Sequence, residues 1–116
     1  MVAIYGVFDF FELKTERGSE AGRALHGDDP NRMRPASPLY RADASAAPTL
    51  LIHGTADVTV PFDQSVSYQR RLRELGVRAD LIPGEGGGHG HIHRPPFFDS
   101  SLQQLEEYKA SLLTLI

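Results

Sequence analysis

Three short runs of apolar residues are spaced along the chain, and each ends at a glycine or at a Pro-Gly pair. The runs are Val2–Tyr5, Thr49–His53 and Ala79–Ile82. They are apolar throughout instead of alternating with polar residues. This pattern is typical of strands that are covered on both faces, as in parallel sheets. We therefore expect three short, buried, parallel strands.

The residues between the second and third runs have the periodicity of a helix. Apolar residues recur at i, i+4 and i+7 from Tyr68, which predicts a helix over Asp63–Leu75. Asp63 is expected to cap the start of this helix, and Gly76 is expected to end it.

A second helix is expected at the end of the chain, where apolar residues form one stripe. Its members are Leu102, Leu105, Tyr108, Leu112 and Leu115. Ser101 and Gln104 have the spacing of a capping box, so the helix is predicted to begin near Ser101. The preceding His93–Phe98 is then a bend. The resulting βαβα order predicts the α/β class, with about three parallel strands and flanking helices.

Residues 8–47 lack such patterns and are rich in charge, glycine and proline. One weak helical pattern covers Glu16–Leu25. A long irregular excursion in a small domain is more often a binding region than a plain connection. We expect residues 1–116 to form a single domain in which 8–47 is a variable insertion or lid-like segment.

Composition narrows the class of protein. Of 116 residues, 41% are hydrophobic and 23% charged, which is the balance of a soluble globular domain. A net charge of −3 provides no basic surface for nucleic acid. The chain has no cysteine and no apolar run long enough to cross a membrane. We expect no membrane and no nucleic-acid partner. Absence of a signal peptide favours the cytoplasm, unless the N-terminus is truncated.

Two residues with catalytic chemistry follow the second and third predicted strands. Asp57 lies just after the strand that ends at His53, and His89 lies in the glycine-rich loop after the next strand. The carboxyl ends of parallel strands share one edge of a sheet, where open α/β sheets place their catalytic groups. We therefore expect Asp57 and His89 to meet. An Asp that fixes the tautomer of a His is two-thirds of a hydrolytic triad.

These motifs resemble a known family. "LLIHGTADVTVPFDQS" followed by "GVRADLIPGEGGGHG" is similar to the C-terminal half of α/β-hydrolases of the carboxylesterase, lipase and prolyl-oligopeptidase-like group. The resemblance implies that Asp57 is the catalytic acid and His89 the base, with His91 as the fallback base. It implies hydrolysis of a small carboxylic ester through a Ser-His-Asp triad. The "ASPLY" segment at 36–40 favours esters over peptides.

The nucleophile of that family is missing from the pattern. The sequence contains no Gly-x-Ser-x-Gly motif, and Gly18-Ser19-Glu20 has the wrong spacing. In the order of the family, the nucleophile would precede Met1, so activity of this chain alone stays open. The alternative is a non-catalytic remnant that self-associates as a homo-oligomer through the edge strand Val2–Tyr5.

The glycine-rich loop allows two other interpretations. His89, His91 and His93 alternate, as three metal ligands on one side of an extended segment would. A metal site also needs rigidity and supporting hydrogen bonds, so we expect neither metal nor cofactor. A phosphate cradle would need a helix directly after the glycines, which this sequence does not predict.

Other candidate residues have simpler interpretations. His53 ends a buried strand and is expected to be a packed, hydrogen-bonded histidine. Three phenylalanines could line an acyl pocket or pack in the core, and the sequence does not decide between these roles. They are Phe8, Phe10 and Phe11.

Overall fold

Three parallel strands form the sheet of the structure, a computed structural model that describes residues 1–9, 31 and 35–113. In their spatial order the strands are β1 (Val2–Ile4), β2 (Thr49–Gly54) and β3 (Ala79–Gly84). Thr49 pairs with Ala79 and Gly54 pairs with Gly84, so β2 and β3 end side by side. The predicted parallel sheet is confirmed. Only the strand ends differ, because β1 stops before Tyr5 and β3 continues to Gly84.

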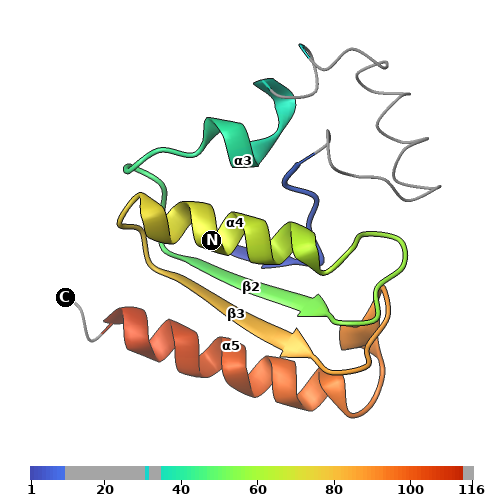
Figure 1. Ribbon diagram of the computed structural model, residues 1–116. Helices are drawn as coiled ribbons and strands as arrows, with labels where there is room; N and C mark the ends of the chain where they lie inside the picture. Colours follow the sequence, from blue (N-terminus) through green and yellow to red (C-terminus); the bar gives the residue numbers. More distant parts are fainter. Residues whose placement is uncertain (10–30, 32–34, 114–116) are drawn as a thin grey trace.

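Helices cover both faces of this sheet (Figure 1). The helical elements are α3 (Pro38–Arg41), α4 (Asp63–Glu74), the 3-10 turn η1 (His91–His93) and α5 (Phe97–Leu113). Because side chains alternate along a strand, Leu51 of β2 packs with Leu72 of α4, whereas Leu50 and Ile52 pack with Tyr108 of α5. All residues of β2 are buried, as expected for a strand between two helical layers.

The two helices that the sequence predicts, α4 and α5, begin at other residues than expected. Phe62, the residue before α4, already has helical dihedral angles, and Asp63 is the first residue of the helix itself, so the predicted cap is wrong. In α5 the carbonyl of Arg94 accepts hydrogen bonds from the N–H groups of Phe97 and Phe98, at 2.9 and 3.3 Å. The helix therefore begins at Phe97, and the predicted capping box at Ser101 is wrong because Ser101 lies inside the helix.

A glutamine side chain fixes the segment after β1 to helix α4. The Gln64 Oε1 accepts hydrogen bonds from the N–H groups of Phe8 and Asp9 at 2.9 and 2.8 Å, and its Nε2 donates to the Asp9 carbonyl at 2.9 Å. The Phe8 ring stacks on Tyr68, with 4.2 Å between the centroids. Phe8 is thus part of the core on the α4 side.

Several expectations concern residues outside the described ranges. They are those on Phe10, Phe11, Glu16–Leu25, Gly18-Ser19-Glu20 and Leu115. The interpretation of residues 8–47 as an insertion in a single domain stays a prediction. In the part of the chain that the structure describes, no helix is both long and apolar enough to cross a membrane.

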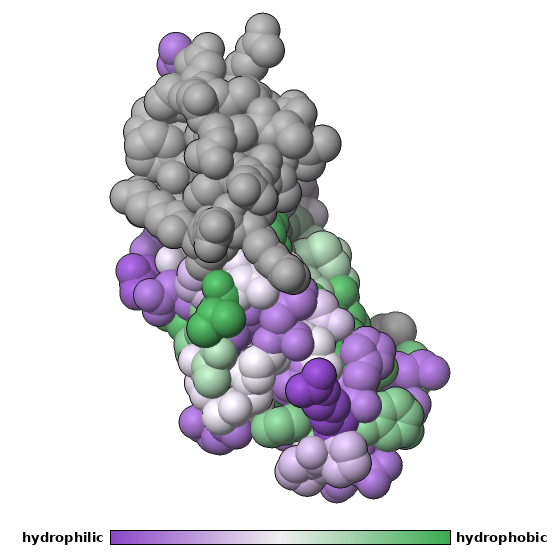
Figure 2. All heavy atoms as spheres, turned by 90° about the vertical axis from the view of Figure 1, so that its right-hand side faces the viewer, coloured by the Kyte–Doolittle hydropathy of each residue, from purple (hydrophilic) through white to green (hydrophobic). Residues whose placement is uncertain are grey.

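The carboxyl end of the sheet is the part of the fold that matters for chemistry. Figure 2 views the molecule from the side toward which the strand arrows point in Figure 1. The described surface on this side is a mixture of hydrophilic and neutral residues, with separate hydrophobic groups between them. Polar side chains are therefore accessible here without a continuous apolar patch.

Candidate active site

Asp57 is held by the turn that follows β2. Its Oδ1 accepts hydrogen bonds from the N–H groups of Thr59 and Val60, both at 2.9 Å. The Asp57 N–H in turn approaches the carbonyl of Gly54 at 3.3 Å. A short polar side chain that accepts from the following N–H groups is a common way to stabilise a turn after a strand. The turn leaves Asp57 Oδ2 free to make other contacts.

The glycine-rich loop after β3 lies directly on this turn. The N–H of Ala56 donates to the carbonyl of Gly87 at 2.9 Å, and the N–H of Gly86 donates to Thr55 Oγ1 at 2.8 Å. Gly86 and Gly90 have φ angles of 73° and 80°, which glycine adopts without steric cost. The glycines therefore provide a close approach of two backbones, not a phosphate cradle.

Gly54→Ala is expected to destabilise the protein by about 3 kcal/mol, because overpacking at a rigid contact forces the backbone to shift. A Cβ atom at residue 54 would lie 2.2 Å from the carbonyl oxygen of Gly87. Gly88→Ala is the matched control, since a Cβ there would meet nothing within 4 Å. Urea unfolding of both variants measures the difference. Equal stability of the two would contradict the close approach.

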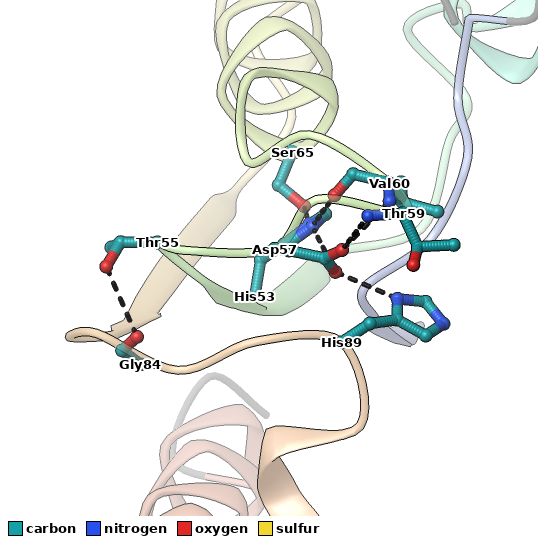
Figure 3. A network of polar contacts seen from close by, with 8 residues as sticks. All are labelled: His53, Thr55, Asp57, Thr59, Val60, Ser65, Gly84 and His89. Atoms are coloured by element: carbon teal, nitrogen blue, oxygen red, sulfur yellow. Dashed lines mark hydrogen bonds and ion pairs between the residues drawn. The ribbon is translucent and has the colours of Figure 1, made fainter. Parts of the chain in front are cut away.

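Asp57 and His89 lie together at the carboxyl end of the sheet (Figure 3). His89 Nδ1 is 2.8 Å from Asp57 Oδ2. The Asp57 side chain is fully buried, whereas that of His89 is 37% exposed. A carboxylate can only accept, so Nδ1 carries the proton and Nε2 the lone pair. In Figure 3 the second ring nitrogen points away from Asp57. His89 therefore presents a basic nitrogen outward.

The charge of Asp57 is stabilised despite its burial. Burial by itself raises the pKa of the Asp57 carboxyl, but hydrogen bonds from the N–H of Val60, from His89 and from the N–H of Thr59 outweigh this effect. The resulting pKa lies below the ordinary value of an aspartate. Asp57 is thus an anion at neutral pH, next to a histidine ring.

His53 is a packed, hydrogen-bonded histidine, as predicted, but it also contacts Asp57. Its Nε2 lies 2.8 Å from the Val60 carbonyl, so this nitrogen is the donor, and Nδ1 accepts from the Ser65 hydroxyl at 2.6 Å. The same Nε2 is 3.3 Å from Asp57 Oδ2. Sequence analysis missed this contact, although the i, i+4 spacing of His53 and Asp57 was a signal.

The other two loop histidines point elsewhere. His91 is 3% exposed, and its ring packs edge-on against Phe97 at 5.1 Å between centroids. Among the described residues, neither ring nitrogen of His91 has a hydrogen-bond partner. His93 is exposed. The alternation predicted for an extended segment is wrong because Gly90 is left-handed and η1 follows. The structure groups no three potential metal ligands within its described ranges.

His91 is expected to make the fold sensitive to mild acid. Burial is the main cause that lowers the pKa of His91, a smaller electrostatic effect of the neighbouring His53 acts in the same direction, and Asp57 acts in the opposite direction. Because the pKa is lower in the folded state, neutral His91 contributes fully to the stability of the fold above about pH 6.5. This stability is lost as the pH falls through the lower pKa of the folded state. The free energy of unfolding should therefore decrease below about pH 6.5.

Denaturant unfolding between pH 7 and pH 5 tests this expectation in His91→Leu, which should lose that decrease relative to the unaltered chain. His93→Leu is the control, because His93 is exposed and should keep the decrease. A decrease that persists in His91→Leu and vanishes in His93→Leu would contradict the assignment to the buried ring.

Residues 1–110 match the Prolyl oligopeptidase family, Peptidase_S9. The chain belongs to this family. It is a family of serine hydrolases with the α/β-hydrolase fold, and its esterase and peptidase relatives agree with that class. The predicted partial α/β-hydrolase fold is thereby confirmed.

Named relatives include both esterases and peptidases. Esterase LipC of Mycobacterium tuberculosis is 30% identical over 99 residues, which are 78% of this chain and 25% of LipC. Acylaminoacyl peptidase of Pyrococcus horikoshii superposes with a TM-score of 0.74 and 29% identity, over 81% of this chain and 16% of that one. Esterase 2 of Thermogutta terrifontis, phosphoramylated by tabun, superposes with a TM-score of 0.74 and 26% identity, over 96% of this chain and 40% of that one. The chain thus spans less than half the length of each.

Proposed function

We propose that this prolyl oligopeptidase family chain supplies the base and the acid of a Ser-His-Asp triad that hydrolyses carboxylic esters. His89 is the general base and Asp57 the acid that orients it. The observation that carries the proposal is the 2.8 Å contact between His89 Nδ1 and Asp57 Oδ2, with the imidazole partly exposed.

The chemistry follows from the tautomer. With its proton on Nδ1, His89 can take a proton from a serine hydroxyl at Nε2 as that serine attacks the ester carbonyl. The imidazolium that forms lies against the buried anion of Asp57, which stabilises its charge. His89 then returns the proton to the departing alcohol. Departure of the alcohol leaves the acyl group on the serine. Water then attacks this acyl-enzyme with the same help from His89, and the carboxylic acid is released.

The nucleophile is proposed to come from a strand beside β1, at the free edge of the sheet. The Met1 carbonyl and the Tyr5 N–H bond to β2, so the alternate residues Val2 and Ile4 direct their backbone groups away from it. No described strand lies on that side. A parallel strand there would end next to β1, at the carboxyl end of the sheet, which is the end where His89 lies.

Peptide hydrolysis is the second candidate, because the family match and the Pyrococcus relative point to peptidases. The ester proposal is supported by the esterases among the relatives and by the "ASPLY" segment at 36–40. Rates on a short-chain p-nitrophenyl ester and on an N-acylated amino-acid p-nitroanilide separate the two. Faster turnover of the anilide would overturn the preference for esters.

The test uses a completed enzyme, by which we mean this chain joined to a nucleophile-bearing segment. A chimera in which this chain replaces the matched 40% of Thermogutta terrifontis esterase 2 is one such protein. Turnover of p-nitrophenyl butyrate and labelling by a fluorophosphonate probe are measured for the chimera and for the chain alone. The proposal expects label and turnover in the chimera and neither in the chain.

Two results would contradict the proposal. A chimera that unfolds cooperatively but is inert would mean that Asp57 and His89 do not serve a nucleophile. A labelled serine in the chain alone would place the nucleophile within these residues. A dimer of the chain in light scattering would instead favour the alternative that this chain self-associates, with the β1 edge as the expected interface.

A further inference from the structure

Tyr5 has an unusual backbone conformation at the end of β1. Its φ angle is 40°, and it is the non-glycine residue with positive φ in the part of the chain that the structure describes. A bulky side chain in this left-handed region costs on the order of 1 kcal/mol. The strand ladder holds the residue there, because the Tyr5 N–H donates to the Ile52 carbonyl at 2.7 Å. Such a cost at the edge of a candidate active site points to a use for the side chain.

The Tyr5 ring lies against the imidazole of His89. Their centroids are 4.4 Å apart, with the planes tilted by 55°. The ring of Tyr5 also meets His91 edge-on at 6.2 Å. In Figure 3 the ribbon of the N-terminal segment passes behind the His89 ring. Tyr5 thus touches the proposed base from the end of β1, whereas Asp57 and His89 follow β2 and β3.

His89 needs such support because its own backbone gives little. It lies between Gly88 and Gly90, and glycines leave the backbone conformationally free. Within the described residues the polar partner of its ring is the Asp57 carboxylate, and more than a third of the side chain is exposed. A hydrogen bond fixes one atom of the ring, whereas an aromatic neighbour restricts its rotation about that bond.

We propose that Tyr5 is a positioning residue, whose ring holds the His89 imidazole in the orientation that directs Nδ1 to Asp57. The inference rests on the proposed function of this pair. The centroid separation of 4.4 Å is that of two aromatic rings in contact, so the Tyr5 ring limits the rotation of the imidazole. The hydroxyl is not needed for this effect, so phenylalanine should replace tyrosine.

The test reads the Asp57–His89 hydrogen bond in the 116-residue chain by proton NMR, independently of turnover. The Nδ1 proton of a histidine bonded to a carboxylate resonates far downfield, and its exchange with water reports how often the bond opens. Tyr5→Ala is expected to speed this exchange about fivefold, because the favourable contact between the two rings is lost. Tyr5→Phe should leave it unchanged. Phe98→Ala, which truncates a ring that is 56% exposed on α5, is the matched control.

A further variant guards against loss of folding. Tyr5→Gly removes the ring but relieves the left-handed φ, so it should fold and still show the faster exchange. Slow exchange in folded Tyr5→Ala or Tyr5→Gly would overturn the role of Tyr5 and leave the Asp57–His89 pair intact. Absence of the downfield proton in the unaltered chain would overturn the pair, and this inference with it. In a completed enzyme, Tyr5→Ala should lower kcat about fivefold with little change in KM, and Tyr5→Phe should restore it.

Discussion

His89→Ala is expected to lower kcat of a completed enzyme by about 10⁶, the loss found when the base of a serine triad is removed. Without His89, no exposed imidazole in the described part of the chain remains beside Asp57 to accept the proton of the attacking serine, because His53 is buried and both of its ring nitrogens are hydrogen-bonded. KM should change little, because the imidazole acts on the transition state and not on the bound ester. Steady-state hydrolysis of p-nitrophenyl butyrate measures both constants.

His91→Leu is the control that decides between the two histidines. His91 is buried, and its ring packs against Gly84 and Gly87 instead of facing Asp57. We expect its kcat to stay within about tenfold of the unaltered enzyme, after correction for stability. Fluorophosphonate titration of active sites supplies that correction. A loss near 10⁶ in His91→Leu, with His89→Ala active, would make the fallback base the true one.

The sheet was predictable because local signals and tertiary structure agree there. Continuous apolar runs led to β2 and β3, and both faces of β2 are indeed buried. The first residues of the helices were not predictable, because they depend on backbone dihedral angles and backbone hydrogen bonds, which the type of side chain does not determine. At α4 the chain is already helical at Phe62, so Asp63 cannot adopt the extended conformation of a capping residue. At α5 the carbonyl of Arg94 accepts the hydrogen bonds of the first helical residues, so the helix begins before Ser101, where the sequence predicts a cap.

The candidate site was predictable in part for a similar reason. Asp57 and His89 each follow directly from a strand end, and parallel pairing places those ends together. The contacts of His53 and Tyr5 depend on ring orientation, which sequence spacing does not determine. The sequence predicts a packed position for His53 and a strand position for Tyr5, and neither prediction contains the contact with Asp57 or the left-handed φ.

Asp57→Asn is expected to lower kcat of a completed enzyme by about 10⁴ while leaving the turn in place. The amide oxygen can still accept hydrogen bonds from the N–H groups of Thr59 and Val60. The amide NH₂ then faces His89 Nδ1 and can only donate to it. The proton of the imidazole moves to Nε2, so the lone pair no longer faces the nucleophile. Kinetics of p-nitrophenyl butyrate hydrolysis check the loss.

The same variant should lose stability in a pH-dependent way. The pKa of folded Asp57 is lowered, so its carboxylate stabilises the fold above the unfolded-state value of about 3.9. That contribution is lost as the pH falls through the lower folded-state pKa. The difference in unfolding free energy between the unaltered chain and Asp57→Asn should therefore be constant near neutral pH and shrink below about pH 4.

Denaturant unfolding at several pH values, with His89→Ala as a second background, shows which contact causes the pH dependence. The Val60 and Thr59 N–H groups lower the pKa of Asp57 without His89, so part of the pH dependence should remain in His89→Ala. If all of it remained, His89 would not stabilise the Asp57 anion despite the distance of 2.8 Å between Nδ1 and Oδ2. If the kinetic loss of Asp57→Asn were then also small, the pair would be a structural contact and not two parts of a triad.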